Sequence, residues 1–291
     1  MGTLYVVATP IGNPLDITLR ALSVLASVAL IASEDTRTTR RLLAHHGVQP
    51  RRLVSYTDHN KTARIPRLLA TLGDGDDVAL VSEAGVPVIS DPGYDLVAAA
   101  AAAGHQVTPV PGASAVMAAI AASGLPARRF LFLGFLSRKA GERRTALRSA
   151  AAIEGAIVIF ESPRRVKATL RDVLEVLGDR RMVAARELTK VHEEFLRGNV
   201  SQVLAALDQP LGEFTLVIDG TSTPSPVQAP GEAESLAGRL AADGLSTRDI
   251  ARELAEAFAM SRREAYALAT RAREAPGQDP TQPPGDSPRS T

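Results

Sequence analysis

Short apolar runs bounded by turn residues recur through the first 110 residues, with helical patterns between them. The runs cover residues 4–8, 28–32, 78–81 and 107–110, and each has the length of a buried strand. Alternating strands and helices are typical of an α/β fold, because a helical crossover lets the next strand lie parallel to the last. The pattern therefore predicts a mainly parallel first sheet.

The apolar runs continue in the second half, with fewer helical patterns between the last of them. Five further strands are predicted, at residues 130–136, 156–160, 182–185, 194–197 and 214–218. Strands joined by short connections pair in antiparallel fashion, so this half is predicted to be a mixed α/β sheet. We place the first domain at residues 1–118 and the second at residues 119–222.

A change in composition separates the remaining residues from the two sheets. Residues 223–231 are rich in proline and lack periodicity, which is typical of a linker. Residues 232–275 carry three helical stretches, with Ser246 and Ser261 placed as N-caps, and predict a small helical domain. The tail at residues 276–291 is expected to be disordered, because it buries too little surface to offset its ordering entropy.

Positive and negative charges nearly cancel over the whole chain. There are 33 Lys and Arg residues and 32 Asp and Glu residues, so the formal net charge of +1 gives no global attraction for nucleic acid. Any RNA-binding surface must therefore be local. The chain has no cysteine, which excludes disulfides and thiolate metal sites and favours a cytoplasmic setting. We expect neither a secretory leader nor a membrane span, because no apolar run has the required length.

Three loops of small residues follow predicted strands of the first sheet. They are Thr-Pro-Ile-Gly-Asn-Pro at 9–14, Ser-Glu-Ala-Gly-Val-Pro-Val-Ile-Ser-Asp-Pro-Gly at 82–93 and Pro-Gly-Ala-Ser at 111–114. Ligands bind at the carboxyl ends of parallel strands, and small residues let the backbone approach them closely. Each loop is also compatible with an ordinary turn, and Ser114 with a simple N-cap. Neither the Gly-x-Gly-x-x-Gly fingerprint nor a phosphate loop ending in Gly-Lys-Ser/Thr is present.

Charged residues follow three other predicted strands. In Ser-Glu-Asp-Thr-Arg at 33–37, Asp35 has the position of a helix cap. Phe-Glu-Ser-Pro-Arg-Arg at 160–165 and Ala-Arg-Glu-Leu-Thr-Lys at 185–190 place charges beside the second sheet, where structural ion pairs are the more frequent role. His192 and the pair His45-His46 lack metal-ligand spacing, so no metal is expected.

Arginine doublets recur along the chain, at residues 40–41, 51–52, 128–129, 143–144, 164–165, 180–181 and 262–263. Most are interpreted as solvated surface. Arginine pairs also suit contact with phosphate, so several on one face would supply the local positive surface that the net charge lacks.

Taken in order, six segments resemble the motifs of one family. They are Ala-Thr-Pro-Ile-Gly-Asn-Pro at 8–14, Glu-Asp-Thr-Arg at 34–37, Glu-Ala-Gly at 83–85 with Ile-Ser-Asp-Pro-Gly at 89–93, Pro-Gly-Ala-Ser at 111–114, Phe-Glu-Ser-Pro at 160–163 and Arg-Glu-Leu-Thr-Lys at 186–190. From about residue 4 to residue 220, and into the helical unit, the chain resembles the RsmI family, the ribosomal RNA small subunit methyltransferase I group of the tetrapyrrole methylase superfamily.

This resemblance implies a fold and an activity. The fold would be a two-domain tetrapyrrole methylase with a small C-terminal helical unit. The methyl donor would be S-adenosylmethionine (SAM), and the acceptor would be the 2′-hydroxyl of a 16S rRNA cytidine in the decoding region, in free rRNA or in the small ribosomal subunit. The family also implies a bacterial, cytoplasmic homodimer.

The resemblance further implies a donor pocket formed by nine residues: Pro10, Ser82, Glu83, Val86, Ser114, Ala115, Glu161, Leu188 and Thr215. The chain departs from the family pattern at Glu83, where Asp is usual, and at Val86, where Thr is usual. Because the longer carboxylate keeps the charge, we expect donor binding to persist with altered geometry.

A ribose hydroxyl is a poor nucleophile until its proton leaves, so methyl transfer needs a base or a cationic group beside it. The family motifs assign no firm general base. Charged residues beside the predicted cleft are the candidates for this step: Glu34, Asp35, Glu187 and Lys190. The candidates for contact with RNA phosphates are Arg37, Arg40, Arg164 and Arg165.

Two other functions fit part of the pattern. A relative that methylates a tetrapyrrole carbon or a modified histidine, as in diphthine synthesis, would use the same donor pocket. The helical unit, the motif at 34–37 and the arginine doublets favour RNA over that alternative. A non-enzymatic RNA-binding protein would use residues 232–275 as a helix-turn-helix, but the near-neutral charge disfavours this as the main role.

Overall fold

The computed structural model describes residues 1–151, 154–220, 232–258 and 260–274. These form two compact units, which divide between Thr221 and Ser222. The predicted linker at 223–231 and the predicted tail at 276–291 lie outside the described residues.

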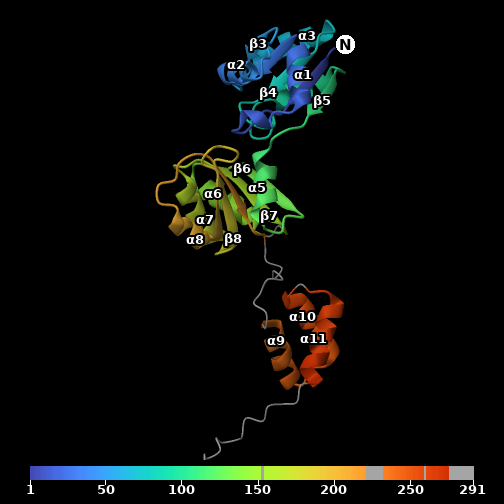
Figure 1. Ribbon diagram of the computed structural model, residues 1–291, viewed down its shortest axis with the longest axis vertical. Coiled ribbons are helices and arrows are strands. Elements are labelled where there is room, and N and C mark those ends of the chain that lie inside the picture. The colour runs from blue at the N-terminus through green and yellow to red at the C-terminus, as the bar shows by residue number, and fades with distance from the viewer. Residues whose placement is uncertain (152–153, 221–231, 259, 275–291) are drawn as a thin grey trace, which may run out of the picture. The chain divides into compact units, whose positions relative to one another are not determined.

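The first sheet is entirely parallel, as predicted (Figure 1). Its strand order is β3-β2-β4-β1-β5. The strands are β1 (Thr3–Val7), β2 (Leu30–Ser33), β3 (Leu53–Ser55), β4 (Val78–Val81) and β5 (Gln106–Val110). The sequence pattern missed β3, because this edge strand has only three residues and all three are only partly buried.

Helices cover both faces of this sheet, because successive strand side chains point to opposite faces. Leu25 of α1 (Leu19–Ser27) and Leu43 of α2 (Thr36–His45) pack with Val7 in one apolar cluster. Leu68 and Leu96 pack with Leu4 in the cluster on the other face. They belong to α3 (Lys61–Gly73) and α4 (Tyr94–Ala102). With both faces covered, a ligand site of this sheet is expected among the loops at its carboxyl edge.

The second sheet is mixed, as predicted, with the order β6-β7-β10-β8-β9. Its strands are β6 (Phe130–Phe135), β7 (Ala156–Glu161), β8 (Arg181–Arg186), β9 (Glu194–Asn199) and β10 (Phe214–Ile218). Only β6 and β7 run parallel among these pairs, and β10 lies antiparallel between β7 and β8. The confirmed fold class is therefore α/β, with a parallel first sheet and a mixed second one.

Helix α5 (Ala115–Ser123) packs on one face of the second sheet through Val116 and Ala119. The other face is covered by α6 (Ala140–Ala150), α7 (Val166–Leu177) and α8 (Val200–Ala206). The predicted domain boundary between residues 118 and 119 falls inside α5, and the division of the first unit into two domains stays a prediction.

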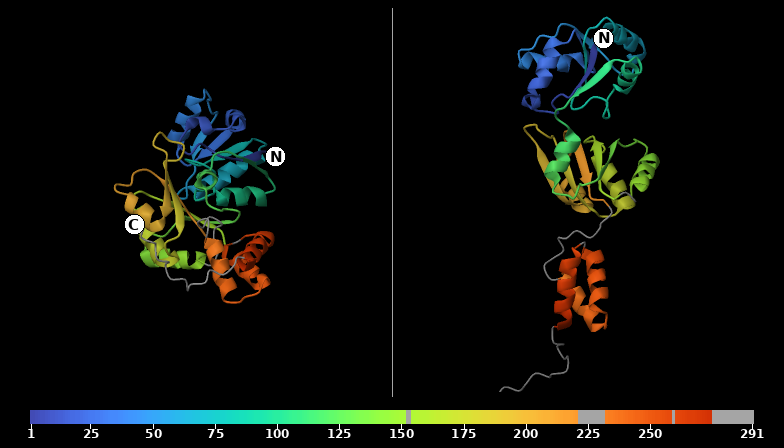
Figure 2. Two further views of the ribbon diagram at one scale, coloured as in Figure 1. Left: turned by 60° about the horizontal axis from the view of Figure 1, so that its bottom comes forward. Right: turned by 90° about the vertical axis from the view of Figure 1, so that its right-hand side faces the viewer.

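The second unit contains three helices (Figure 2), which are α9 (Glu232–Ala242), α10 (Thr247–Phe258) and α11 (Arg262–Glu274). They pack around their own apolar cluster. The predicted N-caps are confirmed, because the Ser246 and Ser261 hydroxyls accept hydrogen bonds from the amides of Asp249 and Glu264. Within the described ranges, no helix is both long and apolar enough to span a bilayer.

A buried ion pair joins α6 to α7. The side chains of Arg143 and Asp172 are each 8% exposed, and Arg143 Nε donates to Asp172 Oδ2 over 2.5 Å. Arg144 adds a second contact to the same carboxylate. Removing one partner would leave the other charge buried and unpaired. The stability lost in this way exceeds the net stabilisation that the ion pair contributes.

Replacing Asp172 tests this interpretation. Asp172→Ala is expected to lower the free energy of unfolding by about 3–5 kcal/mol, measured by urea denaturation, because the Arg143 guanidinium stays buried and unpaired. The control is Glu154→Ala, since Glu154 is 78% exposed and lies 3.6 Å from Arg129. This control is expected to change stability by less than about 0.5 kcal/mol. Equal effects of the two substitutions would contradict a structural role for the buried pair.

Candidate functional site

Three loops of the first sheet and one of the second meet in the first unit. We call this region the loop junction and define it as residues 9–14, 82–93, 111–114 and 186–190. Thr9 and Gly85 join the first two loops through paired backbone hydrogen bonds of 2.8 and 3.1 Å. All three loops of the first sheet follow strands at its carboxyl edge, where ligand sites form in parallel sheets.

Gly12 lets the first loop approach the second sheet closely. A Cβ atom at this position would lie 2.5 Å from Lys190 Cγ and 2.9 Å from the Leu188 carbonyl oxygen. The next residue, Asn13, donates its amide to Thr189 Oγ1 over 3.0 Å. A second contact joins the two sheets at Gly134, where a Cβ would lie 3.0 Å from Ser90 Oγ. The loop junction is thus built from both sheets.

Backbone strain is concentrated in two of these loops. Among the described residues, four that are not glycine have positive φ angles: Val88 at 77°, Ser90 at 65°, Glu187 at 50° and Thr189 at 66°. Positive φ is costly for residues with a Cβ, and above all for β-branched ones such as Val88 and Thr189. Strain of this kind clusters at functional sites, where the surrounding structure over-determines the backbone. Its distribution therefore marks the loop junction as the candidate site.

Three carboxylates gather where β2 and β4 end. Glu34 Oε2 accepts the amide of Glu83 over 3.2 Å, and Asp91 lies close enough to both side chains for their charges to act on it. Burial, followed by the charges of Glu34 and Glu83, raises the pKa of Asp91 to about 6, although a hydrogen bond from Ser82 partly offsets this. No three His, Cys, Asp or Glu side chains in the described part of the chain are arranged to hold a metal ion.

Two of the predicted catalytic residues form an ion-pair network. Lys190 Nζ lies 2.9 Å from Glu187 Oε1 and 2.9 Å from Glu213 Oε2. The hydrogen bond from Lys190 lowers the pKa of Glu187. Burial alone would lower the pKa of Lys190, but its bonds to Glu187 and Glu213 outweigh burial and raise it. The network spans the strained residues of this loop and ties them to the loop before β10.

Asp35 caps α2, as the sequence indicated for its structural role. Its carboxylate accepts the amides of Arg37 and Thr38 and pairs with the Arg37 guanidinium. The side-chain hydrogen bond from Arg37 lowers the pKa of Asp35. A carboxylate held in its charged form is a weak proton acceptor, so the geometry favours Glu34 and Asp91 over Asp35 for that step.

The predicted donor-pocket residues occupy three places. Pro10, Ser82, Glu83 and Val86 lie in the first two loops of the junction, and Ser114 caps α5, whose first residue is Ala115. Leu188 packs in the same apolar cluster as Ala115. Thr215, which is 5% exposed, pairs with Phe160 and Ala185 of that cluster. These residues thus lie in loops of the first sheet, in the loop after β8 and on one face of the second sheet, and their assignment to one donor pocket stays a prediction.

Glu161 does not share that face. Its side chain is fully buried, and it accepts hydrogen bonds from Thr169 of α7 at 2.6 Å and from the Ser162 amide at 2.7 Å. Arg165 adds an ion pair at 3.4 Å. With its carboxylate committed to α7, any contact of Glu161 with a donor has to use the backbone.

The predicted RNA-binding arginines differ in what they contact. Arg40 and Arg164 are exposed, and Arg37 is 89% exposed beside Asp35. Arg165 donates to the carbonyl of Leu136 over 2.5 Å and so holds the end of β6. Arg165 therefore has a structural contact, whereas the other three are open to a ligand.

Sequence reasoning did not single out Asp91 or Glu213 as site residues. Asp91 stands in the quoted segment 82–93, but its raised pKa depends on burial in the fold and on Glu34, which is 57 positions away in sequence. Glu213 is recognisable only through its contact with Lys190. Neither contact has a signal in local residue pattern.

The comparisons with known proteins agree with one another. Residues 3–204 match the model of the Tetrapyrrole (Corrin/Porphyrin) Methylases. Two relatives described as ribosomal RNA small subunit methyltransferase I are similar over most of their length. The one from Micromonospora olivasterospora is 49% identical over 242 residues, covering 82% of this chain and 76% of the relative. The one from Synechocystis sp. is 46% identical over 272 residues, covering 92% and 97%.

Solved structures share the fold at low identity. The methyltransferase CobJ is 20% identical with a TM-score of 0.58, covering 77% of this chain and 96% of its own. A uroporphyrin-III C-methyltransferase from Thermus thermophilus, solved with S-adenyl homocysteine, is 18% identical with a TM-score of 0.54, covering 75% and 97%.

Replacing Gly12 tests the close approach at the loop junction. Gly12→Ala is expected to lower the free energy of unfolding of the first unit by about 1–3 kcal/mol, measured in urea, because the added methyl overlaps the 186–190 loop. Gly141→Ala in α6 is the matched control, since a Cβ atom at Gly141 would have no neighbour within 4 Å. That control is expected to be neutral or to stabilise by up to about 1 kcal/mol through helix propensity. Similar effects at both sites would contradict the proposed constraint.

Proposed function

Because the chain belongs to the tetrapyrrole methylase family, and within it to the ribosomal RNA small subunit methyltransferase I group, we propose that it methylates 16S rRNA with SAM as the donor. The observation that carries this proposal is the extensive identity to relatives of that description. The proposed acceptor is the 2′-hydroxyl of a cytidine in the decoding region. The homodimer and the cytoplasmic setting stay predictions.

The loop junction is the proposed donor site. Ala84, Pro111 and Gly112 are exposed there and carry little or no side chain, so backbone groups are open to a flat ligand. Close packing at Gly12 holds the first loop against residues 188–190, and the backbone hydrogen bonds between Thr9 and Gly85 hold it against the second loop. Bound SAM would supply an activated methyl group on a sulfonium centre. The protein's contribution is then to place the acceptor oxygen in line with that methyl and to remove its proton.

We propose Asp91, with Glu34 beside it, as the proton acceptor. A general base works best when its pKa lies near the working pH, and burial brings Asp91 closer to neutrality than an ordinary carboxylate. At neutral pH it is ionised and free to accept the hydroxyl proton. Asp35, Glu187 and Lys190 stay predictions for turnover, and their contacts suit positioning of α2 and of the 186–190 loop.

The acceptor is tested by methyl labelling. The protein is incubated with tritiated SAM and, separately, with small ribosomal subunits, free 16S rRNA and a porphyrinogen. Label is expected in rRNA, at a cytidine 2′-oxygen that resists alkaline cleavage of the adjacent phosphodiester. Label in the porphyrinogen, or in none of the three, would overturn the proposed function.

The proton acceptor is tested by substitution and by pH. Asp91→Asn is expected to lower kcat by about 100-fold or more, with SAM binding retained in calorimetry, because the amide accepts no proton. The wild-type rate should fall as pH drops through about 6, where Asp91 becomes protonated, and stay level above it.

Substitutions near Asp91 distinguish the loss of a proton acceptor from a general loss of structure. Glu34→Gln removes a neighbouring negative charge and is expected to move the midpoint of the pH profile to lower pH. Asp95→Asn is the control, because Asp95 pairs with Lys61 at 2.6 Å and does not act on Asp91. An unmoved midpoint in Glu34→Gln, or a normal rate in Asp91→Asn, would rule out Asp91 as the base.

A further inference from the structure

Positive charge is concentrated in one stretch of the first unit. Residues 36–73, which span α2, β3 and α3, contain eight Lys or Arg residues and a single acid, Asp58. The whole chain has a formal net charge of only +1. The rest of the chain therefore has a net negative charge, and the excess of positive charge lies in residues 36–73.

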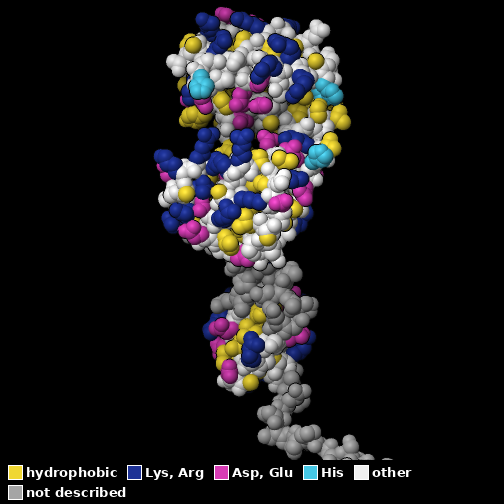
Figure 3. All heavy atoms as spheres, turned by 90° about the vertical axis from the view of Figure 1, so that its left-hand side faces the viewer, with side chains coloured by type: hydrophobic (Ala, Val, Ile, Leu, Met, Phe, Trp, Pro, Cys, Tyr) yellow, Lys and Arg dark blue, Asp and Glu magenta, His cyan; other side chains and the backbone are white. Residues whose placement is uncertain are grey.

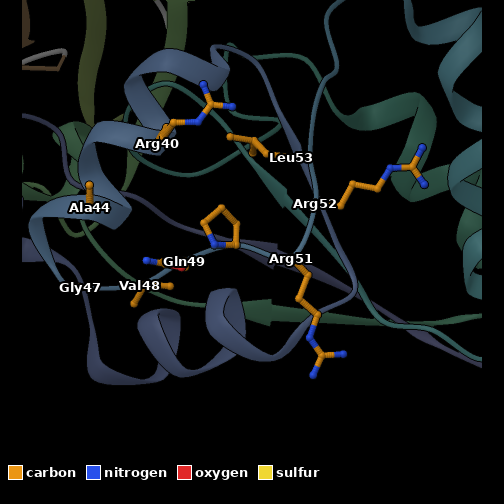
Figure 4. A pocket seen from close by; sticks show the side chains of 9 residues that line it. Arg40, Ala44, Gly47, Val48, Gln49, Arg51, Arg52 and Leu53 are labelled. Atoms are coloured by element: carbon orange, nitrogen blue, oxygen red, sulfur yellow. The ribbon is translucent and has the colours of Figure 1, made fainter.

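The fold brings these cations to one edge of the first sheet. α2 and α3 pack on opposite faces, and the edge strand β3 lies between them. Arg40, Arg51 and Arg52 line a surface hollow of about 490 Å³ beside β3, and their side chains fan out around it (Figure 4). Arg52 also lines an adjoining hollow, with Arg64 and Arg67 of α3. Arginines from three elements thus form one continuous surface.

We define the edge surface by the five arginines that line these hollows, with the exposed Arg41 that follows Arg40 in α2, which gives Arg40, Arg41, Arg51, Arg52, Arg64 and Arg67. In the part of the chain that the structure describes, none of them has a carboxylate within 4.0 Å or donates a side-chain hydrogen bond. By contrast, the doublets at 128–129, 143–144, 164–165 and 180–181 each include an arginine paired with an acid. Figure 3 shows exposed Lys and Arg side chains on one face of the first unit.

Protection of an exposed strand edge does not account for this surface. Charged residues on an edge strand prevent pairing with other chains, and Arg51 and Arg52 beside β3 suffice for that role. Arg40, Arg41, Arg64 and Arg67 lie on helices, where they protect no strand edge. Like charges held together without counter-ions repel one another, so this arrangement favours an anionic partner.

We propose that the edge surface binds the phosphate backbone of the RNA whose nucleotide is methylated at the loop junction. This inference rests on the proposed function and adds five arginines to Arg40 as an RNA-binding surface. Arginine suits the task because its planar guanidinium contacts phosphate through two hydrogen bonds.

The surface also has a direction. α2 begins at the carboxyl edge of the sheet, beside Glu34, and its ten residues extend over roughly 15 Å at 1.5 Å per residue. Its arginines therefore lead from the loop junction toward Arg51 and Arg52 at the start of β3. RNA that follows this line has its target nucleotide at the junction and its flanking phosphates on the edge surface.

The double variant Arg51→Ala/Arg52→Ala tests this proposal. Its binding to 16S rRNA and to small ribosomal subunits is measured by filter retention across a range of salt concentrations. Each lost phosphate contact is expected to reduce the slope of log affinity against log salt by roughly 0.7–0.9, so the double variant should lose up to about 1.4–1.8. The KM for rRNA should rise, while kcat at saturating rRNA and SAM affinity stay unchanged, because neither residue contacts the loop junction.

Arg128→Ala/Arg129→Ala is the matched control, since it removes the same charge from an exposed doublet next to the second sheet. It is expected to keep the wild-type salt slope. An unchanged slope in Arg51→Ala/Arg52→Ala, or an equal loss in the control, would overturn the edge surface. A change in oligomeric state by sedimentation, with RNA binding intact, would assign the surface to contact between copies and also overturn it. The proposed function itself is tested separately by the labelling experiment, and it fails if the wild-type protein transfers no tritiated methyl group to rRNA.

Discussion

The contact between the loop after β1 and the loop after β8 is the constraint on which the candidate site depends. It joins the two sheets through Gly12, whose missing side chain leaves room for the Leu188 carbonyl and Lys190, and through the Asn13 to Thr189 hydrogen bond. The strained backbone at Glu187 and Thr189 is held by the ion-pair network around Lys190. Without this contact, the loop after β1 would not be held against the loop after β8.

Charge is distributed in the first unit in a way that the net value conceals. Carboxylates gather at the carboxyl edge of the parallel sheet, where burial and then the charges of Glu34 and Glu83 raise the pKa of Asp91. Arginines without counter-ions gather along the outer edge beside β3. The net charge of the chain is only +1, because its acids and bases are nearly equal in number. The fold places these acids and these bases in different parts of the first unit. One group is suited to proton transfer and the other to contact with phosphate.

The structural roles of single residues followed well from local pattern. Asp35, Ser114, Ser246 and Ser261 are helix caps, because capping depends only on residues two or three positions away. Roles that depend on residues far apart in sequence could not be predicted from local pattern. The hydrogen bond of the Glu161 carboxylate with Thr169 of α7 was not expected from the sequence, and the contact of Glu161 with a donor stays a prediction. The raised pKa of Asp91 arises from burial and from the charge of Glu34, which follows β2.

Local residue pattern was enough to specify the fold class, most strands and the loops at the candidate site. Apolar runs of four or more residues specify buried strands, because burial on both faces needs continuous hydrophobicity; the partly buried β3 left no such signal. Which loops touch, which carboxylates share a site and which arginines lack partners became visible only in the folded chain. Those properties depend on distances between residues far apart in sequence, and folding alone sets such distances.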